Sequence, residues 1–311
     1  MSETPSDHCS ELVLTGLSGG NLLGFLAALG AFHILSNTLP LSRFRMSWCM
    51  SGGAWRPVLS VASAVSEVSI IDAIEASLCR FRLAPESHPA MLWRGWLEKD
   101  GSVRETLDNH RRNACATMRE TPDWLAAIGT EMPVAKNEDA DSAFRAPRGD
   151  YFIGNLHSII SEASRDHIKK ALFEAWRYDD PLDNLSLKFD ASEDRRHALQ
   201  WAAPSGDPDR RTRGNVLGAN RLALEAIRLF PTALDGAHLA TTGFTGRRSS
   251  RELTWCIWQA PISIETFRSV AALPLERPDT AALREIGISV VYRCRRETIG
   301  KTRIFTRPYP L

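Results

Sequence analysis

The stretch of residues 21–35, NLLGFLAALGAFHIL, decides how the rest of the chain must be arranged. It is typical of a helix, and Asn21, which follows a glycine-rich turn at residues 16–20, is suited to be its N-cap. The apolar side chains fall on every side of this helix, so most of its surface must be buried. Gly24 and Gly30 allow a neighbouring backbone to approach closely. We therefore expect this helix at the centre of the fold.

Segments with the composition of β-strands flank this helix in the sequence. Residues 12–14 precede it, and residues 45–50 and 55–61 follow it, separated by the turn SGG at residues 51–53. Two strands joined in this way indicate a hairpin. Because Pro57 has no N–H group for a strand ladder, we expect the second strand to lie at an edge or to begin late.

Further along the chain, the apolar periodicity predicts helices and then strands again. The expected helices are residues 70–81, 90–99, 102–118, 123–128, 155–176, 217–230, 263–271 and 280–285. The expected strands are residues 185–189, 198–201, 238–244, 252–258 and 286–292. This order predicts an α+β fold, with a helical middle and antiparallel strand pairs toward both ends.

The periodicity stops between residues 131 and 150, where the chain is polar and contains Pro133 and Pro147. Such a segment is typical of a mobile linker or of a loop that becomes ordered on binding. A chain of 311 residues is long enough for one large or two ordinary domains. We therefore expect an N-terminal α+β lobe at residues 1–130 and a C-terminal α+β lobe at residues 151–311.

The composition is that of an ordinary soluble globular protein, with 43% hydrophobic and 24% charged residues. The formal net charge is only +1. A free-standing, non-specific nucleic-acid binder would carry a larger cationic excess, so a nucleic-acid role requires local patches or neighbouring subunits.

The six cysteines are dispersed, without the short spacing of a zinc site or redox pair. The polar N-terminus does not have the features of a secretory signal, and the longest apolar run, residues 22–35, is too short to cross a bilayer. These observations predict a cytoplasmic protein with reduced thiols and no membrane contact.

No motif points to a catalytic set or a cofactor site, although enzyme activity stays open. The glycines of residues 16–21 match neither a P-loop nor a dinucleotide fingerprint, and no Gly-x-Ser-x-Gly elbow occurs. Asp190, Glu193 and Asp194 are hard oxygen ligands that suit a divalent metal. Ion pairing with the arginines that follow them explains this group as well, so our main expectation is that the protein has no metal site.

Basic residues gather in loops of the second half and in the tail, where Phe305 and Tyr309 lie among them. Guanidinium groups neutralise phosphates and aromatic rings stack on bases, which favours nucleic-acid binding. An edge hairpin also carries arginine to block aggregation, so both interpretations stay open. The candidate nucleic-acid contacts are Arg210, Arg211, Arg213, Arg247, Arg248, Arg293, Arg295, Arg296, Lys301, Arg303 and Arg307.

Several of these stretches resemble CRISPR-associated proteins of type I-G (formerly I-U) loci, including the large-subunit-like family described as an extension of the helicase-nuclease. The resembling segments are GGNLLGFLAALG at residues 19–30, MSW at 46–48, WRPVL at 55–59, the segment from KFD at 188–190 to Trp201, and the tail at 291–307. The resemblance implies a protein that acts with a guide RNA, a target DNA, or the assembly that holds them. It implies no catalytic residue.

Our leading hypothesis is therefore a non-catalytic subunit of a CRISPR-Cas interference (Cascade-like) complex that contacts guide RNA or target DNA and other Cas proteins. One alternative is a metal-dependent nuclease that uses Asp190, Glu193 and Asp194. Another is an adaptor without nucleic-acid contact, whose loop at residues 131–150 orders against a protein partner.

Overall fold

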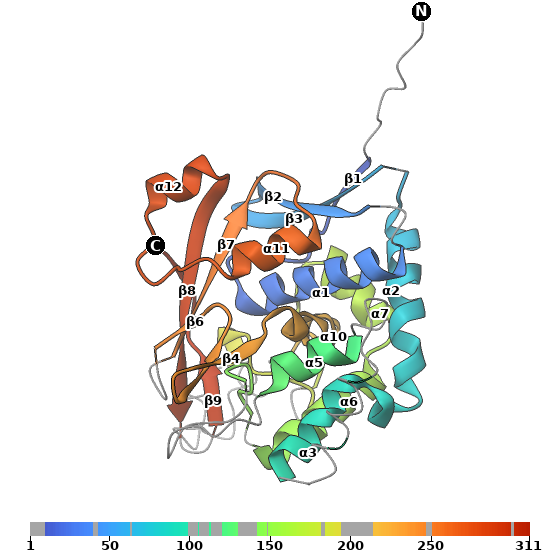
Figure 1. Ribbon diagram of the computed structural model, residues 1–311. Helices are drawn as coiled ribbons and strands as arrows, with labels where there is room; N and C mark the ends of the chain where they lie inside the picture. The colour runs from blue at the N-terminus through green and yellow to red at the C-terminus, as the bar shows by residue number, and fades with distance from the viewer. Residues whose placement is uncertain are drawn as a thin grey trace, which may run out of the picture.

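Helix α1, Leu22–Thr38, runs through the middle of the fold (Figure 1), as its all-round apolar sequence predicts. Every residue from Leu22 to Leu35 is buried. The Asn21 side chain caps the helix and accepts a hydrogen bond of 3.0 Å from the Gly24 N–H group. The rest of the chain is arranged around this helix.

The computed structural model describes most, but not all, of the residues of the chain. These are residues 10–39, 43–62, 64–98, 105, 112, 120–129, 142–147, 149–181, 184–193, 214–246, 251–299 and 302–311.

An antiparallel sheet of β1 (Ser10–Val13), β3 (Ala54–Val61) and β2 (Arg45–Ser51), in that order, covers one side of α1 (Figure 1). The hairpin prediction is confirmed, but the edge position expected from Pro57 is wrong because β3 is the central strand. The Pro57 carbonyl accepts a hydrogen bond from Leu14 N, so the missing N–H group faces the end of β1. Pro57 has no N–H group to donate to the Leu14 carbonyl. That carbonyl accepts a hydrogen bond from Leu17 N instead.

The second sheet is built from the C-terminal part of the chain, in the order β10-β8-β7-β6, with β9 also paired to β8. Its strands are β6 (Phe244–Thr245), β7 (Glu252–Trp258), β8 (Ile288–Ile299), β9 (Thr302–Phe305) and β10 (Tyr309–Pro310). The expected strand at residues 238–244 is divided, because β5 (His238–Thr241) pairs with β4 (Thr232–Asp235) and only β6 pairs with β7.

Helices fill the middle of the chain, which together with the antiparallel sheets confirms the α+β prediction. They are α2 (Glu67–Arg82), η2 (Pro85–Ser87), η3 (Pro89–Leu92), α3 (Trp93–Glu98), α5 (Glu120–Ile128), α6 (Gly149–Glu162), α7 (Arg165–Phe173), η4 (Ala191–Glu193), α10 (Leu217–Ala226), η5 (Ile227–Leu229), α11 (Ile264–Ala271) and α12 (Thr280–Glu285).

Two local predictions in this part are wrong. The single helix expected at residues 155–176 is broken, because the Ser164 side chain caps a new helix, α7, by accepting from His167 N. The strand expected at residues 185–189 is irregular chain. The strand expected at 198–201 and most of the helix expected at 102–118 lie outside the described residues.

Residues 142–147, the described end of the segment expected to be mobile, belong to the core. Ser142, Ala143 and Phe144 are fully buried, and the Phe144 ring contacts the rings of three phenylalanines, Phe189, Phe230 and Phe244. These residues are therefore packed into the core, and the expectation of a mobile linker or loop over residues 131–150 as a whole stays a prediction. Residues 131–141 lie outside the described part of the chain.

Buried side chains from residues before 130 and after 151 form one continuous cluster. The two parts are in direct contact where α1 packs on α10, because a Cβ atom at Gly30 would overlap the backbone of Leu222. The division into two lobes stays a prediction. The two expected lobes share one hydrophobic core. Within the described ranges, no helix has both the length and the apolar character needed to cross a membrane.

Substitution Gly30→Ala tests this contact. We expect it to lower the free energy of unfolding by about 1–3 kcal/mol, because the methyl group forces α1 and α10 apart. Gly154→Ala in α6 is the control, since a Cβ atom there meets no neighbour within 4 Å; it should raise stability by about 0.5–1 kcal/mol. Urea denaturation measures both changes, and equal effects at the two sites would contradict the packing.

Candidate functional site

The arginines of β8 serve different purposes, because successive side chains of a strand point to opposite faces of the sheet. Arg296 points into the core, where it is 2% exposed and donates a 3.0 Å hydrogen bond to the Ala143 carbonyl. Arg293 is covered on the other face, where it donates to the carbonyls of Leu275 and Glu276. Both guanidinium groups therefore hold the fold together.

Arg295 of β8 and Arg307, between β9 and β10, are exposed on the side of the sheet where the tail at residues 302–311 pairs with β8, which we call the outer edge of the sheet. Thr306 N donates to the Arg295 carbonyl, and Tyr309 of β10 lies opposite Arg293. The Arg295 side chain is 56% exposed, with Nη2 3.4 Å from Oε1 of Glu252. Tyr309, whose backbone partner Arg293 is two residues before Arg295 on β8, is 46% exposed.

Arg303 lies near this edge but is half-buried, and its backbone N–H group donates to the Ala146 carbonyl. The other candidate cations, Arg210, Arg211, Arg213, Arg247, Arg248 and Lys301, lie outside the described residues. The carbonyl of Arg251, the first described residue after Arg248, accepts a hydrogen bond from Arg296 N.

The carboxylate group proposed as a metal site has one described side chain, and it is occupied by hydrogen bonds. Asp190 is 4% exposed and accepts from the Tyr178 hydroxyl at 2.9 Å and from Ser192 N at 2.8 Å. The side chain of Glu193 and the whole of Asp194 are not described. Among the side chains that are described, no group of three His, Cys, Asp or Glu residues could hold a metal.

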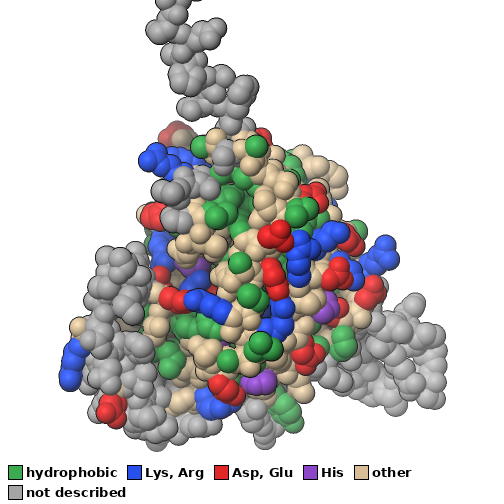
Figure 2. Space-filling model, turned by 90° about the vertical axis from the view of Figure 1, so that its right-hand side faces the viewer, with side chains coloured by type: hydrophobic (Ala, Val, Ile, Leu, Met, Phe, Trp, Pro, Cys, Tyr) green, Lys and Arg blue, Asp and Glu red, His purple; other side chains and the backbone are tan. Residues whose placement is uncertain are grey.

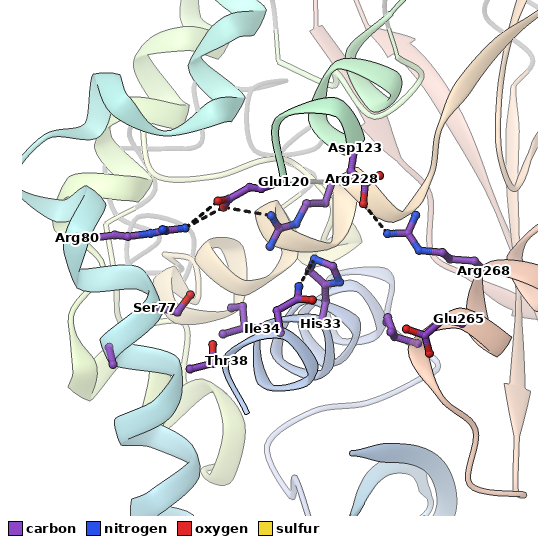
Figure 3. A pocket seen from close by; sticks show the side chains of 13 residues that line it. His33, Ile34, Thr38, Ser77, Arg80, Glu120, Asp123, Arg228, Glu265 and Arg268 are labelled. Atoms are coloured by element: carbon purple, nitrogen blue, oxygen red, sulfur yellow. Dashed lines mark hydrogen bonds and ion pairs between the residues drawn. The ribbon is translucent and has the colours of Figure 1, made fainter. Parts of the chain in front are cut away.

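A charged pocket of about 540 Å³ lies between α1, α2, α5, η5 and α11 (Figure 3). One side is a row of ion pairs, in which Glu120 of α5 joins Arg80 of α2 at 2.9 Å and Arg228 of η5 at 3.3 Å. Asp123 and Arg268 continue the row at 2.7 Å. No sequence motif indicates this pocket, because its residues come from segments far apart in the chain.

Behind the pocket wall lies a buried network centred on Glu225. Its Oε1 atom is 2.6 Å from Arg221 Nη1 and 2.7 Å from His88 Nε2, and its Oε2 atom is 3.2 Å from Arg228 Nη2. Burial opposes ionisation of Glu225, but the attraction of Arg221 and Arg228, with the hydrogen bond from His88, holds its pKa well below the ordinary value. The spacing of Arg221, Glu225 and Arg228 along one expected helix was a signal for this network.

His88 is neutral in this network. Its Nδ1 atom accepts a 3.1 Å hydrogen bond from Ala90 N, so the ring proton is on Nε2, which donates to Glu225. Burial is the main reason that the pKa of His88 lies below its ordinary value, since it disfavours the charged ring.

The molecular face presented by α2 and the end of α1 carries acidic and basic side chains side by side (Figure 2). No field of one sign dominates the described part of that face, so it does not attract a polyanion as a large basic patch does. Comparison of the sequence with protein-family models gives no match, and comparison with curated proteins gives none.

The neutral state of His88 makes stability depend on pH. In the unfolded chain this histidine has its ordinary pKa near 6.5, so it takes up a proton there first as the pH falls. We expect the free energy of unfolding to fall below pH 6.5, by up to about 1.4 kcal/mol per pH unit from this group, until the lower folded-state pKa is reached.

The variant His88→Gln keeps one donor and one acceptor but does not titrate, so its stability should depend less on pH in this window. His157→Gln is the control, because the His157 side chain is 43% exposed. Urea denaturation from pH 7.5 to 5 measures the dependence. A pH slope that is the same for His88→Gln and wild-type protein would show that His88 is not held neutral.

Proposed function

We propose that the protein is a non-catalytic subunit of a CRISPR interference complex, as the resemblance of residues 19–30 and of the tail implies. In this proposal it contacts guide RNA or target DNA with the outer edge of its C-terminal sheet. The observation that supports this most is the pairing of the tail with β8, which brings the exposed Arg295, Arg307 and Tyr309 to one edge.

These three side chains have the chemistry that a nucleic-acid strand requires. Guanidinium groups bind phosphate oxygens, and an exposed aromatic ring offers a stacking surface for an unpaired base. The pairing of Arg295 with Glu252 is no obstacle, because an exposed ion pair contributes little and can be exchanged for a phosphate. Arg293 and Arg296 are not part of the proposed contact, since their guanidinium groups bind backbone carbonyls.

The net charge of +1 fits a subunit that shares its polyanion with basic neighbours, in this proposal other Cas proteins in the cytoplasm. We assign no reaction to the protein. The hydrogen bonds from Tyr178 and Ser192 to Asp190 favour a structural role for that carboxylate over the alternative of a metal-dependent nuclease.

Combined substitution of Arg295→Ala and Arg307→Ala tests the proposed contact. We expect weaker binding of labelled RNA or DNA, and a slope of log K against log salt that is smaller by about 1 for each arginine that contacts a phosphate. Fluorescence anisotropy over a salt series measures both quantities, for the protein alone and with its co-encoded partners.

The matched control is Arg165→Ala in α7. This arginine is also paired and about as exposed, at 45%, and its helix α7 lies away from the C-terminal sheet (Figure 1). An unchanged affinity and salt slope in the double variant would contradict the contact. Absence of binding at low salt, alone and with partners, would contradict the function itself.

A further inference from the structure

The buried network behind the pocket carries an unbalanced positive charge. Arg221 and Arg228 contribute two positive charges, Glu225 contributes one negative charge, and His88 is neutral. The side chains of Arg221 and Arg228 are only 1% and 7% exposed. Because a buried charge without a counter-charge is unfavourable, an anion must lie next to Arg228.

Glu120 supplies that anion in this structure, but its interaction with Arg228 is weak. Its side chain is 37% exposed, and its Oε1 atom is 3.3 Å from Arg228 Nη1. Its second partner, Arg80, is 54% exposed. The pair of Glu120 with Arg80 is open to water and contributes little, and Arg228 keeps a counter-charge when another anion takes the place of the Glu120 carboxylate. The buried Nε atom of Arg228 also has no hydrogen-bond partner in the described part of the protein.

We propose that this pocket binds a small sugar phosphate or nucleoside monophosphate, and that Glu120 occupies the phosphate position when the ligand is absent. Arg80 and Arg228 reach this position from two different helices, on either side of the Glu120 carboxylate (Figure 3). Planar guanidinium groups match the oxygens of a phosphate, which carries more charge than a carboxylate.

The remaining lining fits the rest of such a ligand. Asn37, Thr38 and Ser77 offer amide and hydroxyl groups from α1 and α2, and the carboxylates of Asp123 and Glu265 lie toward the other end of the pocket (Figure 3). Carboxylates accept hydrogen bonds from sugar hydroxyl groups. The volume of about 540 Å³ is within the range of small-molecule sites.

This inference does not rest on the proposed nucleic-acid contact, because Arg295 and Arg307 do not line the pocket. Either the pocket proposal or the nucleic-acid proposal can be wrong while the other is correct. Variants at Arg80 and Glu120 test the pocket, and variants at Arg295 and Arg307 test the sheet edge.

Isothermal titration calorimetry of the full chain with ribose 5-phosphate, adenosine 5′-monophosphate and inorganic phosphate tests the proposal. In Glu120→Gln the internal competitor is gone, so we expect the organic phosphates to bind at least about tenfold more tightly than to wild type. In Arg80→Ala they should bind at least about tenfold more weakly than to wild type. Glu86→Gln, which alters an exposed ion pair with Arg94 outside the pocket, should leave affinity unchanged.

Three results would overturn the proposal. The first is absence of binding of the organic phosphates to Glu120→Gln at millimolar concentration. The second is an affinity for the organic phosphates that is the same in Arg80→Ala as in wild type. This test remains valid even if Glu120→Gln folds poorly. The third is inorganic phosphate binding as tightly as ribose 5-phosphate, because the sugar would then contribute nothing.

Discussion

The burial of α1 on all its sides is the constraint on which the rest of the structure depends. A helix without a polar face has to be enclosed, and no single neighbouring element can enclose it. Phe25 shows how this is done, because its ring stacks on Trp48 of the N-terminal sheet and on Trp255 of the C-terminal sheet. The edge of Phe267 from α11 completes the contact. Segments from both ends of the chain are therefore packed around one helix.

This enclosure explains why charged residues of similar sequence have different roles. When the C-terminal strands pack onto the core, every second side chain of β8 is turned inward, and a buried guanidinium group must find hydrogen-bond acceptors. Arg296 donates a hydrogen bond to the Ala143 carbonyl, whereas the Arg295 side chain is exposed to solvent. In α10 and η5, both Arg221 and Arg228 form ion pairs with Glu225. Arg228 forms a second ion pair with Glu120 at the pocket.

The sequence predicted those features that depend on local chemistry. The N-cap at Asn21, the β2–β3 hairpin and the burial of α1 follow from residues that are neighbours in the chain. The central position of β3 did not follow from Pro57, because it depends on where β1 adds to the sheet. The burial of residues 142–147 depends on distant phenylalanines. The charged pocket joins Arg80, Glu120 and Arg268, which no sequence spacing connects.

The proposed nucleic-acid contact at the outer edge of the C-terminal sheet is tested most directly by ultraviolet crosslinking to RNA and DNA, followed by mass spectrometry of the crosslinked peptides. The exposed ring of Tyr309 and its position beside Arg295 and Arg307 predict crosslinks in the peptides that cover β8 and the tail at residues 302–311. Crosslinks confined to peptides of α2, α6 or α7 would place the contact on the opposite side of α1 and would contradict it.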